Sequence, residues 1–208
     1  TAARGGQKAA ARICPAARSA AAGNWNQQVI IEFNSGIAQD THMKPVPPER
    51  MPGERKLEGA AACEQALDEL IANAAYTVRI FDKSIGHGFD SPRRYELLRR
   101  LLLARRTNRV YIVLHETANI IRDCPRLMLL LRQFSHAVSI HRTLPEARCV
   151  YDPFAIADDT RFVRRFHYDV VRGVATVGDV AATQLLLKRF DEIWHASAPS
   201  VPATTVGL

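Results

Sequence analysis

The sequence lacks any apolar run approaching the ~20 residues that a membrane-spanning helix requires. Its longest apolar runs, Leu101–Ala104 and Leu127–Leu131, have charged residues close by. We therefore expect a soluble chain with no membrane partner.

Cysteine is scarce, and none of its positions forms a CxxC pair or the close spacing with histidine that is typical of zinc sites. The four residues are Cys14, Cys63, Cys124 and Cys149. Most fall on apolar or boundary positions, where cysteine behaves as a small hydrophobe. This usage predicts reduced thiols and a cytoplasmic location.

The chain also lacks a His-x-x-x-His pair on one helix. Its histidines at strand ends and loops, among them His115, His136, His141 and His167, are typical of hydrogen-bonding partners. We therefore expect no metal and no cofactor.

The charge and length of the chain predict one folded domain with an appendage. The 208 residues are 47% hydrophobic, which is sufficient for a packed core. Residues 1–55 hold seven Lys/Arg against four Asp/Glu, and residues 56–208 hold 21 against 17, so the folded part carries +4 of the net +7. This mild basic bias favours either ordinary solubility or an anionic partner.

Residues 1–42 are rich in Ala, Gly and Arg and do not begin with methionine. Met43 opens a more ordinary start, so we hypothesise that 1–42 is a translated leader upstream of the true start. Prolines then follow at positions 45, 47, 48 and 52. We predict a disordered tail and Pro-rich linker over 1–55 and a flexible C-terminal tail over 199–208.

Between these tails, residues 56–198 alternate between helical and strand patterns. Apolar residues at helical spacing begin at Leu57, and β-branched or aromatic runs indicate short strands. The predicted order is helix 57–74, strand 76–81, helix 91–106, strand 109–114, helix 123–134 and strand 137–141. Helices of this length as crossovers imply parallel strand pairing.

After position 146 the pattern changes to short strands joined by tight turns. Strands are predicted at 154–157, 161–166 and 173–177, and a closing helix at 182–194. We expect these strands to extend the sheet in mixed orientation.

This succession of elements resembles one half of the phospholipase D-like fold over about residues 57–198. Shorter stretches resemble a bacterial domain family of unknown function related to that superfamily; these are Phe81-Asp82-Lys83, Asp90-Ser91-Pro92, Cys124-Pro125-Arg126-Leu127, Arg132–His136, Asp152-Pro153-Phe154, Arg164–His167 and Phe190–Trp194. The resemblance implies an α/β fold whose mixed, mostly parallel β-sheet is flanked by helices. It implies no activity.

Active members of the superfamily use a His-x-Lys-x-x-x-x-Asp motif, in which histidine attacks phosphorus, lysine neutralises phosphate oxygens and aspartate steadies the histidine. If Asp158 is the aspartate here, Tyr151 and Pro153 stand at the other two positions. If Asp159 is the aspartate, those positions hold Asp152 and Phe154.

Neither register supplies a nucleophilic histidine or a lysine. The Gly-Ser-x-Asn element that normally follows is replaced by Val163-Arg164-Arg165-Phe166. We therefore predict a degenerate site with no catalytic residue.

Ligands of parallel sheets usually lie outside the carboxyl ends of the strands. The candidate ligand-binding residues at those ends are Asp82, Lys83, His115, Glu116, His141 and Arg142, bordered by Arg164, Arg165 and His167. Arginine pairs bind phosphate through bidentate hydrogen bonds. Two interpretations stay open: an anion site, or ion pairs that only terminate strands.

The leading functional hypothesis is a non-catalytic binding or regulatory module for a phosphate-bearing ligand or a nucleic-acid backbone. A homodimer is a further hypothesis, because active relatives join two halves. One alternative is a phosphodiesterase in which His141 or His167 acts as the nucleophile across a dimer. Another is a protein-interaction adaptor that uses exposed helix faces.

Overall fold

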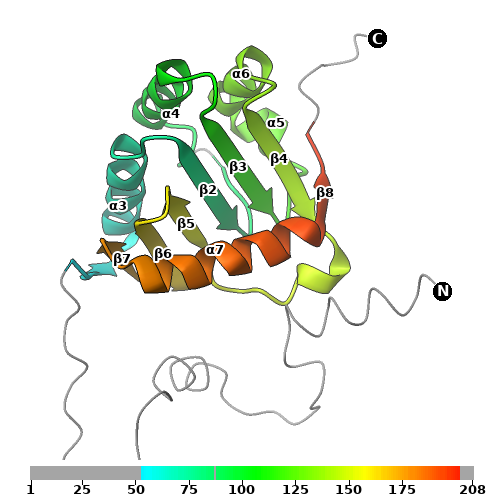
Figure 1. The fold of residues 1–208 in the computed structure, drawn as a ribbon. Coiled ribbons are helices and arrows are strands. Elements are labelled where there is room, and N and C mark those ends of the chain that lie inside the picture. The colour runs from blue at the N-terminus through cyan, green and yellow to red at the C-terminus, as the bar shows by residue number, and fades with distance from the viewer. Residues whose placement is uncertain (1–52, 87, 202–208) are drawn as a thin grey trace, which may run out of the picture.

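The computed structural model describes residues 53–86 and 88–201, so the predicted N-terminal tail lies largely outside the described residues (Figure 1). The elements are, in order, β1 (Arg55–Glu58), α3 (Ala60–Ala72), β2 (Thr77–Asp82), α4 (Pro92–Ala104), β3 (Arg109–Leu114), α5 (Ile120–Asp123), α6 (Pro125–Gln133), β4 (Val138–Thr143), a 3₁₀ turn at Pro145–Ala147, β5 (Phe154–Ala157), β6 (Arg161–His167), β7 (Val170–Val177), α7 (Val180–His195) and β8 (Ser197–Pro199).

The strands form one eight-stranded sheet in the order β1-β7-β6-β5-β2-β3-β4-β8. Only β2, β3 and β4 pair in parallel, and every other neighbouring pair is antiparallel. The α/β class and the mixed sheet are confirmed, whereas the expectation of a mostly parallel sheet is wrong. The sheet is mostly antiparallel because β5 pairs with β2 rather than with β4, and tight turns then add β6 and β7 as antiparallel neighbours.

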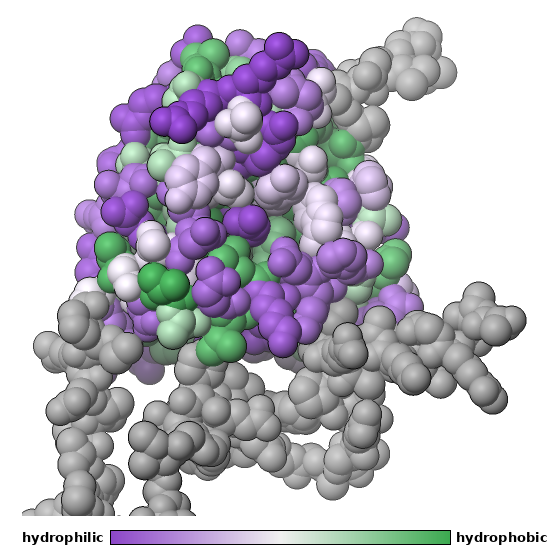
Figure 2. Space-filling model, viewed as in Figure 1, coloured by the Kyte–Doolittle hydropathy of each residue, from purple (hydrophilic) through white to green (hydrophobic). Residues whose placement is uncertain are grey.

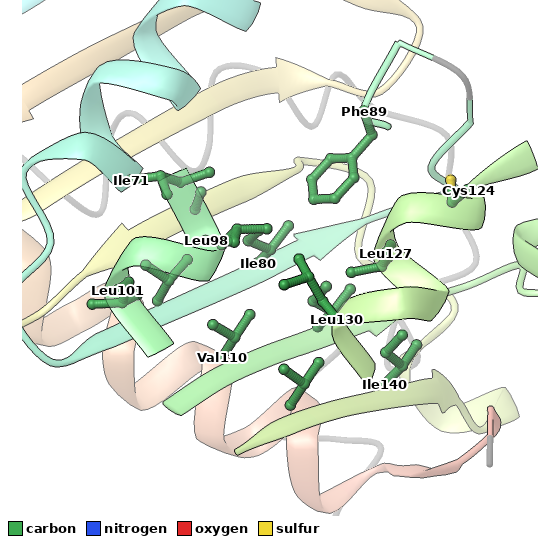
Figure 3. Close-up of a cluster of buried hydrophobic side chains, with 14 of the residues drawn as sticks. Ile71, Ile80, Phe89, Leu98, Leu101, Val110, Cys124, Leu127, Leu130 and Ile140 are labelled. Atoms are coloured by element: carbon green, nitrogen blue, oxygen red, sulfur yellow. The ribbon is translucent and has the colours of Figure 1, made fainter. Parts of the chain in front are cut away.

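Helices cover the two sheet faces unequally. Helices α3, α4 and α6 lie on one face, and α7 crosses the other near the carboxyl ends of β2, β3 and β4 (Figure 1). The larger apolar core lies on the first face, where Ile80, Leu98 and Leu130 come together from β2, α4 and α6 (Figure 3). A second core packs Phe81, Val113 and other strand residues against α7.

Differences from the sequence expectation concentrate at element ends. Leu57 does not begin a helix but is a buried residue of β1, opposite Gly173 of β7. Gly59, with φ at 89°, turns the chain between β1 and α3, a conformation that favours glycine. Strand β8 and the short helix α5 had no counterpart in the prediction.

The thiols differ in their state. Cys63 and Cys124 are free and buried, as expected. The expectation of a reduced thiol is wrong for Cys149, which is disulfide-bonded. Cys14 lies outside the described residues. Among residues 53–86 and 88–201 there is no helix with the length and apolarity needed to cross a membrane.

The buried carboxylate of Asp158 holds the beginning of β2. Its oxygens accept the backbone N–H groups of Ala75, Tyr76 and Thr77 at 2.9, 3.0 and 2.9 Å. In return, the Asp158 N–H donates to the Thr77 carbonyl oxygen at 2.9 Å. Asp158 itself has a positive φ of 53°, which aspartate and asparagine tolerate better than most residues. The turn after β5 is thereby fastened to the first residues of β2.

We expect Asp158→Ala to lower the free energy of unfolding by on the order of 3 kcal/mol, because it leaves three backbone donors without their acceptor. Asp158→Asn keeps one acceptor oxygen and the tolerance for positive φ, so its loss is smaller. Urea unfolding followed by circular dichroism measures both. Asp159→Ala is the matched control at the exposed neighbour, and a loss there equal to that of Asp158→Ala would contradict the assignment.

Candidate ligand site at the carboxyl edge of the parallel strands

The site is centred on an ion pair between Asp82, the last residue of β2, and Arg165 of β6. The Nη2 atom of Arg165 donates to both carboxylate oxygens, at 3.0 and 2.8 Å. The two strands are not neighbours, since β5 lies between them. Both side chains therefore reach across β5 on the sheet face that α3 covers, and each is 23% exposed.

The electrostatics of this pair depend on burial. Desolvation raises the pKa of the Asp82 carboxyl to about 6, and the Arg165 guanidinium opposes that rise. The pKa of the Asp82 carboxyl therefore lies well above the ordinary value of an aspartate, near 3.8.

A cavity of about 240 Å³ opens beside the pair. Its walls come from α3, from the ends of β2 and β5, from β6, and from the segment that leads from β2 to α4. Apolar side chains dominate the lining, and the polar side chains are those of Asp82, Arg165, Glu64 and Ser84. Cys63 also lines the cavity, and burial raises the pKa of its thiol, so the thiol form is favoured there.

One cavity wall is held in place by the buried guanidinium of Arg94 in α4. Its Nη1 donates to the carbonyl oxygens of Gly88 and Phe89, both at 3.3 Å. Its Nε pairs with Asp68 at 2.8 Å and its Nη2 with Glu64 at 2.6 Å. The side chain thus fastens the segment before α4 to α3.

The outer rim of the site consists of Lys83, Tyr151, His167 and Tyr168. The Lys83 ammonium lies 4.5 Å from the centroid of the Tyr168 ring, a cation–π contact. The His167 ring lies 4.3 Å from Tyr168 and 5.8 Å from Tyr151. Lys83 directly follows β2, and His167 is the last residue of β6, beyond a register shift that follows Arg165. These four side chains do not line the cavity itself.

The motif position lies at this same place. Asp158 is buried and bonded to the start of β2 whereas Asp159 is exposed, which favours the register with Asp158. In that register, Tyr151 stands in the rim and Pro153 lines the cavity.

Arg164 does not join its neighbour Arg165. Successive strand residues point to opposite faces, so Arg164 lies on the α7 side. There its Nε donates to Asp152 at 3.0 Å, and Arg189 of α7 donates to the other Asp152 oxygen at 2.5 Å. These contacts form a structural ion-pair triad that joins β6 to α7.

Two of the histidines are also engaged elsewhere. The His115 nitrogens lie 2.8 Å from the Thr143 hydroxyl and 2.7 Å from the Val150 carbonyl oxygen, and burial lowers its pKa. His141 stacks on Trp194 at 3.7 Å on the α7 side, and burial lowers its pKa as well.

Two further predicted residues lie beside the site without joining the ion pair. Glu116 is exposed, and its N–H donates to the Lys83 carbonyl oxygen at 2.9 Å. Arg142 is exposed at the end of β4, beside β8. Of the nine predicted residues, the structure pairs Asp82 with Arg165 and separately places Lys83 and His167 against the Tyr168 ring.

Sequence reasoning missed several residues of the site, notably Glu64, Cys63 and Tyr151. The first two lie on a helix read only as amphipathic, and their contact with strand ends depends on how α3 lies across the sheet. No group of three or more His, Cys, Asp or Glu residues in the described part of the chain is placed to hold a metal ion.

The arrangement of strands and helices is similar to the phospholipase D-like fold. A family model described as "Domain of unknown function (DUF7931)" matches residues 59–203, and the chain belongs to that family. No curated protein matches the sequence.

Solved structures support the fold assignment. The archaeal chromatin protein TrmBL2, whose structure is described as showing a novel mode of DNA binding, is 14% identical with a TM-score of 0.51; the match covers 83% of this chain and 59% of TrmBL2. Nuc from Salmonella typhimurium, a phospholipase D family member, is 14% identical with a TM-score of 0.50; the match covers 71% of this chain and 97% of Nuc. At this identity the likeness shows the shared fold. The chain spans less than two thirds of the length of TrmBL2.

The raised pKa of Asp82 predicts a specific pH dependence. Between the ordinary value near 3.8 and about 6, the folded protein binds a proton that the unfolded chain does not. The contribution of Asp82 to stability therefore increases as the pH falls from 7 to 4, by roughly 3 kcal/mol at most for a shift of about two units.

Carbon-13 NMR titration of the carboxyl groups measures the pKa directly, and urea unfolding of Asp82→Asn across this pH range measures the linkage. Arg165→Gln should move the Asp82 pKa still higher, because it removes the opposing positive charge. An Asp82 carboxyl that titrates near 4 in the parent protein would refute both expectations.

Proposed function

We propose that this domain is a non-catalytic phospholipase D-like binding module for a phosphate-bearing ligand, held at the Lys83, Arg165 and His167 edge. The observation that carries the proposal is the Arg165 guanidinium, which lines a cavity at the position of the superfamily's catalytic motif. A homodimer and a cytoplasmic location stay hypotheses within this proposal.

Arg165 is suited to hold an anion because only part of its guanidinium is used. Asp82 accepts from Nη2, and within the described residues Nε and Nη1 have no hydrogen-bond or ion-pair partner. Asp82 therefore orients the group while two nitrogens remain available. Guanidinium nitrogens in this planar arrangement match the oxygens of a phosphate.

Lys83 supplies a second positive charge to the same edge. Its ammonium contacts the Tyr168 ring and forms no ion pair with a carboxylate of residues 53–86 or 88–201. A phosphate oxygen is a stronger partner for an ammonium than an aromatic face. Ligand binding would thus exchange a weak contact for a charge-assisted hydrogen bond.

The absence of the motif's chemical groups from the sequence supports a non-catalytic role. Phosphoryl transfer through a covalent intermediate needs a nucleophile and charge stabilisation at one place. In the favoured register those positions hold Tyr151 and Pro153. Of the two imidazoles considered as alternative nucleophiles, His167 has its Nδ1 occupied by the Asp169 N–H at 3.1 Å, and His141 lies on the other sheet face.

The similar structures are consistent with a phosphate-containing partner. TrmBL2 is described as binding DNA, and Nuc as a phospholipase D family member. Because the likeness extends only to the fold, the proposal depends on the residues of this edge rather than on those proteins.

Inorganic pyrophosphate is a suitable probe, since it carries phosphate oxygens without a base or a chain. In isothermal titration calorimetry, we expect Lys83→Ala and Arg165→Gln each to weaken binding by about tenfold, as expected when one charge-assisted contact is lost. The matched control is Arg172→Gln, an exposed arginine of β7 without an ion pair among the described residues. Equal affinity in all four proteins would leave the Asp82–Arg165 pair a purely structural contact.

We expect no phosphodiesterase activity from the purified protein. A chromogenic phosphodiester should show no turnover above buffer, and intact-mass measurement after incubation should show no phosphorylated protein. Turnover that persists through repeated chromatography and disappears in His167→Ala would replace this proposal with the enzymatic alternative.

A further inference from the structure

Helix α7 does not cover the whole of its sheet face (Figure 1). It crosses near the carboxyl ends of β2, β3 and β4, where Phe81 and Val113 are buried beneath it (Figure 1). Toward the beginning of the same strands, the residues on this face are only partly buried; they are Thr77, Arg79, Arg109, Tyr111 and Ser139. We call this set the open face.

The open face is aromatic where it meets α7. The Tyr111 ring packs edge-on against Trp194 at 5.1 Å, and Trp194 stacks on His141 at 3.7 Å. The guanidinium carbon of Arg79 lies 5.9 Å from the Tyr111 centroid. The Arg79 guanidinium and the rings of Tyr111 and His141, from three neighbouring strands, thus lie beside the Trp194 ring of α7, and all three rings are partly exposed.

The open face is also positively charged. Within the described residues, neither Arg79 nor Arg109 forms an ion pair, and the Arg109 guanidinium donates only to the carbonyl oxygens of Arg106 and Asn108. Arg105 and Arg106 are exposed at the adjoining end of α4.

Acidic residues on the bordering elements do not neutralise these arginines. Asp159 lies in the turn between β5 and β6, and Asp191 and Glu192 lie on α7. None of the three pairs with an arginine of the open face. Figure 2 shows residues of intermediate hydropathy in the middle of this side of the molecule, with mostly hydrophilic residues above them and hydrophilic and hydrophobic residues mixed below them.

We propose that the open face binds a single-stranded nucleic acid. Bases stack on aromatic side chains and on guanidinium planes, and the backbone phosphates are attracted to arginines that form no ion pair within the protein. A protein partner that buries a sheet face would favour apolar side chains there, whereas these positions hold arginine, threonine, serine and tyrosine. Charge complementarity thus selects the polyanion.

A single strand fits this surface better than a duplex. Bases within a duplex are already stacked on each other, so their faces are not available to Tyr111 or Arg79. Sheets that present aromatic side chains to single-stranded RNA hold roughly two or three bases. The open face lies on the opposite side of the sheet from the Asp82–Arg165 pair, so this inference does not depend on the proposed function.

The experiment uses the full chain and a fluorescently labelled 12-nucleotide oligouridine, with anisotropy measured at low and moderate salt. We expect Arg79→Gln/Arg109→Gln to weaken binding at least tenfold and to reduce the salt dependence. Tyr111→Leu, which keeps most of the packing volume, should weaken it about fivefold or more. Ultraviolet cross-linking should attach the oligonucleotide to peptides that contain Tyr111 or Trp194.

Two controls separate this site from the edge site. Arg172→Gln removes an exposed strand arginine elsewhere, and Lys83→Ala alters the rim; both should retain oligouridine binding. The Arg79→Gln/Arg109→Gln variant should in turn retain pyrophosphate binding, which also shows that it is folded. The proposal would be overturned if the parent protein failed to bind oligouridine, and that result would favour a protein partner. It would also be overturned if the parent bound a duplex with equal affinity, or if only Lys83→Ala lost oligouridine binding.

Discussion

The carboxylate of Asp158 is the constraint from which the arrangement of the site follows. By accepting the first backbone donors of β2, it fixes β5 beside that strand, with Val78 opposite Ala157 and Phe81 opposite Phe154. This register brings the beginning of β5 to the carboxyl end of β2. The next strand, β6, then carries Arg165 to within hydrogen-bond distance of Asp82. Asp158 thus has a structural role that needs no histidine.

Local elements could be predicted well from the sequence because their signals are local. The strands at 109–114 and 154–157 have the predicted bounds, and Ser91 caps α4 through its hydroxyl, as expected from Ser91-Pro92. Strand order could not be predicted in the same way. Whether β5 pairs with β2 or with β4 depends on contacts between residues about eighty positions apart. The sequences of β2 and β4 contain no pattern that excludes either strand as the partner of β5.

The candidate site was predictable only in part. Alternation along β6 already implies that Arg164 and Arg165 face opposite sides, although the sequence does not say which side holds the cavity. Asp82 and Arg165 could be placed near the carboxyl edge of the parallel strands only on the assumption that β6 lies close to β2. The engagement of Arg164 with Asp152 and Arg189 depends on where α7 crosses, and the open face depends on how little of the sheet that helix covers. Both are properties of three-dimensional packing rather than of any short segment.

The buried Arg94 guanidinium links the interior of the helical layer to the cavity wall. It contacts no ligand-facing surface of its own, yet its hydrogen bonds position the backbone of Gly88 and Phe89 and the carboxylate of Glu64. The position of this cavity wall therefore depends on a residue of α4, one layer away from the sheet. A substitution of Arg94 would therefore change the shape of the cavity without altering any side chain that lines it.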